Sequence, residues 1–229
     1  MNREDAGRQL AARLAEYEGD PRVLVLGLPR GGVPVAYEVA RLLGAPLDVL
    51  VVRKLGVPGH RELAMGAIAS GGGRFLNREV IDALRIPAAS VQAVEDAELR
   101  EIERQEQIFR GDAGPARFAG CKVIVVDDGL ATGSTMRAAV RALRRCAPAQ
   151  IIVAAPVGAA ETVRSLREEA DSVVCLSEPL EFQAVSMWYD DFSQTSDEEV
   201  HDLLEARRRE EGAWATSAGT LGKPLNTRR

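Results

Sequence analysis

The stretch Val123-Ile-Val-Val-Asp-Asp-Gly-Leu-Ala-Thr-Gly-Ser-Thr135 joins an apolar run to two acids and then to a turn of small residues. The unbroken run of Val and Ile predicts a central, buried parallel strand over residues 123–126. In open α/β sheets, ligands bind outside the carboxyl ends of the strands. Asp127 and Asp128 end this strand, so we expect both acids at a ligand-binding edge of a sheet.

The residues after the two acids supply what a phosphate group needs. Glycines let the main chain come close to a ligand, and hydroxyl and N–H groups follow at the positive start of a helix. The residues expected to hold the phosphate and its surroundings are Gly129, Ala131, Thr132, Gly133, Ser134 and Thr135. Because carboxylates repel phosphate, Asp127 and Asp128 must serve another part of the same ligand, either sugar hydroxyls or a divalent cation. Two other roles stay open to these acids, a structural cap and an aspartyl-phosphate nucleophile, although the nucleophile requires a one-residue spacing that is missing.

Apolar runs alternate with helical patterns along the rest of the chain, which is typical of repeated βα units. The predicted strands are 23–27, 47–52, 123–126, 151–155 and 172–176, and the predicted helices are 34–43, 88–110, 134–145 and a last helix that begins with the capping box Ser196-Asp-Glu-Glu199. We therefore expect an α/β fold with an open, mainly parallel twisted sheet flanked by helices and a small hood or lid. One domain is expected over 1–212, followed by a flexible tail over 213–229.

Between Arg53 and Met65 neither the strand period nor the helix period holds. Glycines, a proline and charges predict a mobile functional loop there, with a lid over about 54–66. Arg53 and Lys54 are cations at its mouth, and Glu62 is its only carboxylate. Each could equally be an ordinary solvated loop residue. The helix over 88–110 is mostly charged, so we expect it on the surface or at a subunit contact.

A second anion-binding turn is predicted at Pro29-Arg30-Gly31-Gly32, between the first strand and a helix. Taken alone it could be a plain turn with an exposed arginine, but it shares a sheet edge with Asp127. The spacing matches neither the dinucleotide fingerprint nor the P-loop. The aromatic segment Trp188-Tyr-Asp-Asp-Phe192 is either a packing anchor or a wall for a planar base. The candidate residues to contact such a base, as the group that accepts part of the ligand, are Leu130, Trp188 and Tyr189.

Composition narrows the class of protein. A net charge of −5 gives no reason to expect nucleic-acid binding, and no apolar run approaches the ~18 residues of a membrane span. We expect a cytoplasmic protein. Three scattered cysteines (Cys121, Cys146, Cys175) favour reduced structural thiols, and two histidines exclude a His-rich metal centre.

Together these motifs resemble the type I phosphoribosyltransferases, whose signature is a hydrophobic strand, two acids, a small-residue loop and Gly-[Ser/Thr]-Thr. The resemblance covers roughly residues 20–200 and is closest to a bacterial group with Leu-Pro-Arg-Gly-Gly, Val-Arg-Lys and Trp-Tyr-Asp-Asp-Phe. It implies a Mg²⁺-dependent transferase of nucleotide metabolism that uses phosphoribosyl pyrophosphate (PRPP), and a homodimer. Its partners would be PRPP and a nitrogenous acceptor, with neither nucleic acid nor membrane.

The resemblance also implies roles for individual residues. Asp127 and Asp128 would bind the ribose hydroxyls, with Mg²⁺ held mainly through PRPP and these acids as its candidate protein ligands. The 5′-phosphate would lie on residues 131–135, and the pyrophosphate on Arg30, Gly31 and Gly32 with help from Arg53 and Lys54. Arg30, Lys54 and Glu62 would be the catalytic residues. Family members often carry a cis peptide in the pyrophosphate loop, which here would be Arg30–Gly31.

The acceptor is less clearly indicated than the donor. The 6-oxopurine enzymes carry an Asp base at the loop position held here by Ala131, and the adenine enzyme uses a loop glutamate, which makes Glu62 the candidate. The Ser-Tyr pair of the adenine enzyme's lid is missing, so adenine does not follow. The alternatives are a PRPP-binding regulator without transferase activity and an accessory domain that acts on a partner protein.

Overall fold

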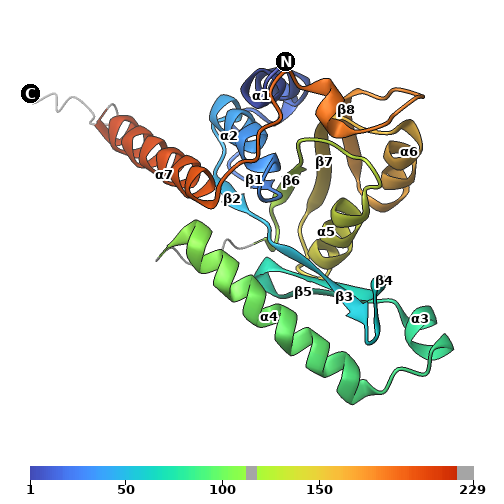
Figure 1. Cartoon of the computed structure of the whole chain (residues 1–229). Coiled ribbons are helices and arrows are strands. Elements are labelled where there is room, and N and C mark those ends of the chain that lie inside the picture. The colour runs from blue at the N-terminus through green and yellow to red at the C-terminus, as the bar shows by residue number, and fades with distance from the viewer. Residues whose placement is uncertain (112–117, 221–229) are drawn as a thin grey trace, which may run out of the picture.

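The central layer is a five-stranded parallel sheet in the order β2-β1-β6-β7-β8 (Figure 1). The structure, a computed structural model, describes residues 1–111 and 118–220, and for residues 61, 62 and 212–220 it describes the main chain only. The strands are β1 (Val23–Gly27), β2 (Leu47–Val49), β6 (Lys122–Val126), β7 (Gln150–Val157) and β8 (Ser172–Ser177). All of its strand pairs are parallel, which confirms the expected fold class.

Helices cover both faces of this sheet, because side chains alternate between the faces along each strand. On one face Val25 and Ile124 share a core with α1 (Arg3–Arg13) and α2 (Gly32–Leu43). On the other face Leu24 and Val123 share a second core with α5 (Ser134–Arg144) and α6 (Ala160–Glu169). The two cores fix the sheet between helical layers, so the loops at its carboxyl edge are carried on a rigid base.

The strand order places a topological switch point between β1 and β6. The chain passes from β1 to β2 in one direction, whereas β6 lies on the other side of β1, with Gly27 opposite Val126. The helices that follow β1 and β6, α2 and α5, therefore pack in different cores on opposite faces of the sheet. The carboxyl edge at such a switch point is where α/β sheets bind ligands.

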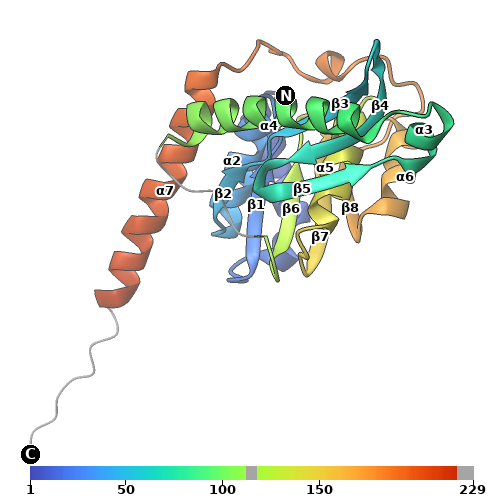
Figure 2. The same ribbon diagram turned by 90° about the horizontal axis from the view of Figure 1, so that it is seen from below.

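A second, antiparallel sheet of β3 (Val52–Val57), β4 (His60–Ala69) and β5 (Gly73–Leu76) forms a hood beside α5. It is followed by α3 (Arg78–Ala83) and by α4 (Ala88–Arg110), and α4 lies across the hood (Figure 2). One face of α4 is buried through Val91, Ile102 and Phe109, while the exposed face carries Asp96, Arg100, Glu103 and Arg104.

The hood corrects two sequence-based expectations. The predicted strand 47–52 is split, because the chain leaves the parallel sheet after Val49 and re-enters a strand in the hood at Val52. The predicted irregular loop 53–65 is largely the β3–β4 hairpin. Register shifts on both sides of Gly56 break the alternation of its side chains, which is why no two-residue period is visible in the sequence.

Helix α1 is not predicted by the sequence patterns. Asn2 caps it by accepting a hydrogen bond from the Asp5 main-chain N–H at 2.7 Å, and Ala6, Leu10 and Leu14 are fully buried against the domain. These three apolar residues recur at intervals of four, but the segment around them is mostly polar, so the helical pattern is weak in the sequence.

The last helix, α7, spans Asp197–Thr220 and extends away from the sheet beyond its contacts with α2 and α4 (Figure 1). Its predicted cap is confirmed, since Ser196 Oγ accepts from the Glu199 main-chain N–H at 3.0 Å. The helix continues past residue 212, although a tail is predicted from 213 onward; residues 221–229 lie outside the described part. The three cysteines are free thiols, as predicted. None of the described helices combines the length and the apolar character that a membrane span requires.

Candidate functional site

The site is built where the β1–α2 loop meets the β6–α5 loop. The Leu28 main-chain N–H donates to Val126 O at 2.9 Å, which joins the two loops at their base. A Cβ on Gly31 would overlap Asp128 Oδ2, and one on Gly32 would lie 2.6 Å from Val126 O. Glycine at these positions therefore leaves room for one loop to pack on the other, in addition to any contact with a ligand.

Asp127 and Asp128 lie side by side at the end of β6, as the sequence predicts. Burial and then the neighbouring charge of Asp128 raise the pKa of Asp127 to about 8. Burial also raises the pKa of Asp128, against the opposing effect of a hydrogen bond from Arg3. Two carboxylates in a poorly solvated position are stabilised by cations or hydrogen-bond donors, which sugar hydroxyls and Mg²⁺ both provide.

Arg3 at the start of α1 is a residue of this site that sequence reasoning missed. Its Nε and Nη2 donate to Asp128 Oδ2 at 3.1 and 2.9 Å, and both side chains are largely buried, at 12% and 14% exposed. Its guanidinium also lies 4.5 Å from the Phe192 ring centroid. The two residues are 125 positions apart, so no local signal in the sequence links them.

Tyr189 is a packing anchor. Its side chain is only 7% exposed, it contacts Phe192 at 5.3 Å between ring centroids, and its hydroxyl donates to the Asp128 main-chain carbonyl at 2.6 Å. Trp188 ends a short 3₁₀ turn, Val185–Trp188, and is 36% exposed. Of the three residues proposed to contact the acceptor, Leu130 has a side chain that is 1% exposed and belongs to the core between the sheet, α5 and α6.

The predicted phosphate loop is open to solvent at the amino end of α5. Gly133 adopts φ +66° directly before the helix, a conformation that glycine takes without strain. Thr132 Oγ1 and Ser134 Oγ lie 3.0 Å apart, and Arg137 donates to the Thr132 carbonyl at 2.5 Å. Ala131, Thr132, Ser134 and Thr135 are all exposed. The loop thus carries exposed hydroxyls at the start of a helix, a combination that suits a phosphate.

A cavity of about 400 Å³ lies next to this loop and is lined by cations from three elements. Arg30 comes from the β1–α2 loop, Arg53 from β3 and Arg104 from α4, and Thr135 completes the side toward the phosphate loop. Arg30 lies 3.6 Å from Asp197, which is the acid in the lining. Arg104 was not among the predicted site residues, because the spacing of charges on a surface helix does not show which of them faces a cavity.

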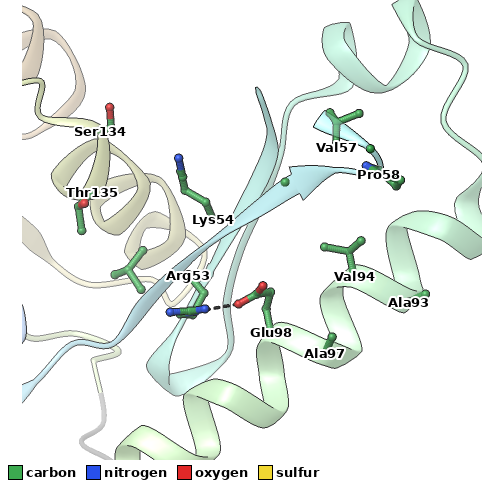
Figure 3. A pocket seen from close by; sticks show the side chains of 13 residues that line it. Arg53, Lys54, Val57, Pro58, Ala93, Val94, Ala97, Glu98, Ser134 and Thr135 are labelled. Atoms are coloured by element: carbon green, nitrogen blue, oxygen red, sulfur yellow. Dashed lines mark hydrogen bonds and ion pairs between the residues drawn. The ribbon is translucent and has the colours of Figure 1, made fainter. Parts of the chain in front are cut away.

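A larger cavity of about 630 Å³ lies between the β3–β4 hairpin, α4 and the start of α5 (Figure 3). Arg53 is held by an ion pair with Glu98 at 2.7 Å, whereas the Lys54 side chain is exposed and points toward the start of α5, where Ser134 and Thr135 lie. Val57, Val94 and Ala97 give the cavity an apolar wall. The predicted lid residues therefore face the phosphate loop across a space large enough for a small ligand.

Two further expectations concern the loops themselves. The cis peptide is Pro29–Arg30, one residue before the expected Arg30–Gly31, since residue types in the turn do not specify which bond is cis. Glu62 is in strand β4, and its side chain lies outside the described residues.

The two acids fit a Mg²⁺ ion that is bound chiefly by its substrate. Within residues 1–111 and 118–220, no group of three or more His, Cys, Asp or Glu side chains is arranged to hold a metal. Asp127 and Asp128 are oxygen ligands of the kind that Mg²⁺ prefers, and this ion commonly takes its remaining ligands from phosphates and water.

Comparisons with known proteins agree with this geometry. The model of the phosphoribosyl transferase domain matches residues 1–191. The protein named "Putative phosphoribosyl transferase Rv0571c" in Mycobacterium tuberculosis (strain ATCC 25618 / H37Rv) is 48% identical over 209 residues, which are 91% of this chain and 47% of that relative. A protein of strain CDC 1551 / Oshkosh matches equally. The chain thus spans about half the length of these curated relatives.

A solved structure supports the fold over most of the chain. The crystal structure of TT1426 from Thermus thermophilus superposes with a TM-score of 0.76 and 39% sequence identity, covering 89% of this chain and 96% of that one. A family model that matches residues 1–191 includes α1, the parallel sheet, the hood and the Trp188-Tyr-Asp-Asp segment. The chain therefore belongs to the phosphoribosyl transferase domain family.

Proposed function

We propose that this protein transfers ribose 5-phosphate from PRPP to a nitrogenous acceptor, a nucleobase in the first instance, and releases pyrophosphate. The observation that carries the proposal is the convergence of three groups at one sheet edge: two adjacent acids, an open hydroxyl-rich loop at a helix start and an arginine-lined cavity. A sugar with a phosphate at one end and a diphosphate at the other has the matching groups.

The donor would span the two loops. Its 5′-phosphate would lie on residues 131–135, and its ribose hydroxyls would donate to Asp127 and Asp128. The diphosphate would extend into the cavity lined by Arg30, Arg53 and Arg104. In a chain whose net charge is −5, this local cluster of cations supplies the attraction that the whole molecule does not.

In the reaction the bond between C1′ and the pyrophosphate oxygen breaks, and the leaving group takes the electron pair. The acceptor nitrogen supplies the lone pair of the new C1′–N bond, and its proton passes to a base. The ribose gains oxocarbenium character between these events, as in other glycosyl transfers, so neighbouring carboxylates stabilise it. Mg²⁺, when bound, would neutralise charge on the diphosphate. Arg30 would neutralise the remainder, and residues 54–66 would cover the site and exclude water.

The proposed base is Glu62. It is carried on the hairpin whose Lys54 side chain points toward the phosphate loop, which supports placing a proton acceptor on the same element. Replacing Glu62 by Gln keeps the size of the side chain and removes the proton acceptor, so we expect turnover to fall by about 10²–10⁴. The measurement is the steady-state rate with the true acceptor; an unchanged rate would reduce Glu62 to a surface residue.

The direct test incubates the protein with PRPP and Mg²⁺ and a panel of purine and pyrimidine bases, and follows pyrophosphate release. A base-dependent release above the rate of the Asp127→Ala variant supports the transferase. If PRPP binds in calorimetry but no base is consumed, the result favours the alternative function, a PRPP-binding regulator without transferase activity.

We also propose a cytoplasmic homodimer, for which the family supplies the main support. Light scattering of the purified chain gives the oligomeric state. If the chain is a monomer at all concentrations, the proposed homodimer is wrong. The proposed donor site would not be affected, since the residues assigned to PRPP all come from one chain.

A further inference from the structure

Arg3 contacts the donor site through more of its polar atoms than the docking of a helix requires. Nε and Nη2 bind Asp128 Oδ2, and Nη1 donates to the Ser193 carbonyl at 2.9 Å. The guanidinium is packed against Phe192 at 4.5 Å and lies 5.6 Å from the Tyr189 ring centroid. The arginine is thus held in one orientation by a carboxylate, a carbonyl and two rings.

Asp128 is held from three sides by this arrangement. Arg3 binds its carboxylate, the Tyr189 hydroxyl binds its carbonyl at 2.6 Å, and the absent Cβ of Gly31 makes room for Oδ2. Both bonds from Arg3 go to Oδ2. The other carboxylate oxygen, Oδ1, receives no bond from Arg3.

Helix α1 does not need Arg3 in order to stay attached. Ala6, Leu10 and Leu14 are each 0% exposed and lie against the domain, and this apolar contact is the main source of its packing energy. A largely buried guanidinium aimed at one carboxylate adds a desolvation cost that an apolar side chain would avoid. Its presence is better explained by what it does to Asp128.

We propose that Arg3 is a positioning residue of the donor site, which holds the Asp128 carboxylate in the orientation that accepts a ribose hydroxyl. The inference rests on the proposed function, because it assumes that Asp128 binds ribose. It assigns to the first turn of α1 a role in donor binding, with Trp188-Tyr-Asp-Asp-Phe192 as the support that keeps the arginine in place.

The experiment measures the affinity of the full chain for ribose 5-phosphate and for inorganic pyrophosphate by calorimetry. The variants are Arg3→Ala, Arg3→Lys and, as a matched control on the same helix, Arg8→Ala, whose side chain is 44% exposed and pairs with Asp5 at 2.6 Å. We expect Arg3→Ala to weaken ribose 5-phosphate binding by about tenfold or more, because the acceptor of a charge-assisted hydrogen bond is no longer held. Pyrophosphate binding should be unchanged, Arg3→Lys should recover part of the loss, and Arg8→Ala should resemble the wild type.

A double-mutant cycle separates positioning from a general loss of structure. If Arg3 acts through Asp128, then adding Arg3→Ala to Asp128→Asn should cost much less affinity than it does in the wild type. A parallel loss of both ligands in Arg3→Ala would show a structural role only and would overturn the proposal. Tighter binding of ribose 5-phosphate would also overturn it, because Arg3 would then compete with the sugar. A wild-type protein that binds neither PRPP nor ribose 5-phosphate would instead refute the proposed function.

Discussion

Among single residues, the groups that share the end of β6 matter most for the site. Asp127 and Asp128 are consecutive and poorly solvated, and burial raises the pKa of both, so their ionised forms cost free energy unless a ligand or a cation compensates them. Arg3 compensates one of the two acids by direct hydrogen bonds. Ribose hydroxyls or Mg²⁺ would supply such compensation to the pair, as the proposed function requires.

The first prediction concerns these acids. Asp127→Ala and Asp128→Ala should each weaken PRPP binding by roughly 1.5–3 kcal/mol, because ribose hydroxyls lose charge-assisted hydrogen bonds. Isothermal calorimetry with PRPP and Mg²⁺ measures the loss. The control is Asp96→Ala, an exposed acid on α4. If the double variant binds PRPP with unchanged affinity, the two acids do not bind the ribose.

A second prediction for a single residue concerns Gly31. A methyl group there would overlap the Asp128 carboxylate, so Gly31→Ala should destabilise the protein by about 1–3 kcal/mol. Chemical denaturation measures the free energy of unfolding. In an Asp128→Ala background the same substitution should cost less, because the overlapping oxygens are gone. Equal costs in the two backgrounds would mean that Gly31 is required for its main-chain conformation instead.

Among the helices and strands, α4 has a part in the site that its surface position does not suggest. One face packs on the hood, and its carboxyl-terminal half brings Arg104 to the cavity that also contains Arg30 and Arg53. The hairpin β3–β4 supplies Arg53 and Lys54 to the other side of the same region. The hood therefore contributes charge to the pocket besides covering it.

This arrangement predicts that α4 helps to bind the leaving group. Arg104→Ala should weaken pyrophosphate binding about three- to tenfold, a modest effect because the side chain is largely exposed and already paired with Glu101 at 2.7 Å. Arg100→Ala is the matched control, since Arg100 is exposed on the same helix and does not line the cavity. Competition of pyrophosphate with PRPP gives both constants. Equal effects of the two variants would point to bulk charge on the helix.

In the molecule as a whole, the residues proposed to bind the donor come from elements that are distant in sequence but close at one sheet edge. Helix α1 and the segment before α7 contact Asp128, while the β1–α2 loop, the hood, α4 and Thr135 line the neighbouring cavity. Binding of a ligand that contacts several of them should stabilise the folded chain as a unit.

PRPP should accordingly raise the unfolding temperature. At a concentration of about one hundred times the dissociation constant, linkage adds about 2.7 kcal/mol. For a chain of this size this corresponds to roughly 5–10 °C in Tm. Differential scanning calorimetry with PRPP and Mg²⁺ measures the shift, with Mg²⁺ alone as the control. The Asp127→Ala, Asp128→Ala double variant should show a much smaller shift, and an equal one would place the bound PRPP elsewhere.

The parallel sheet, most of the helices around it and the donor loop could all be predicted from the amino-acid sequence. These features depend on consecutive residues: an unbroken apolar run buries both faces of a strand, and the residues that follow fix the turn and the helix start. Residues 123–135 therefore indicate both a fold class and a ligand. The β3–β4 hairpin could not be predicted in this way, because its register shifts remove the local pattern.

Which side chains meet at the site was settled by the folded chain alone. Asp128 joins Arg3 across 125 positions, Arg104 lines a cavity, and Leu130 lies in the core although Ala131 and Thr132 are exposed. Such contacts follow from the strand order and from the packing of helices on each face of the sheet. They leave no signal in the spacing of residues along the chain, because the whole core sets the positions of the elements that bring them together.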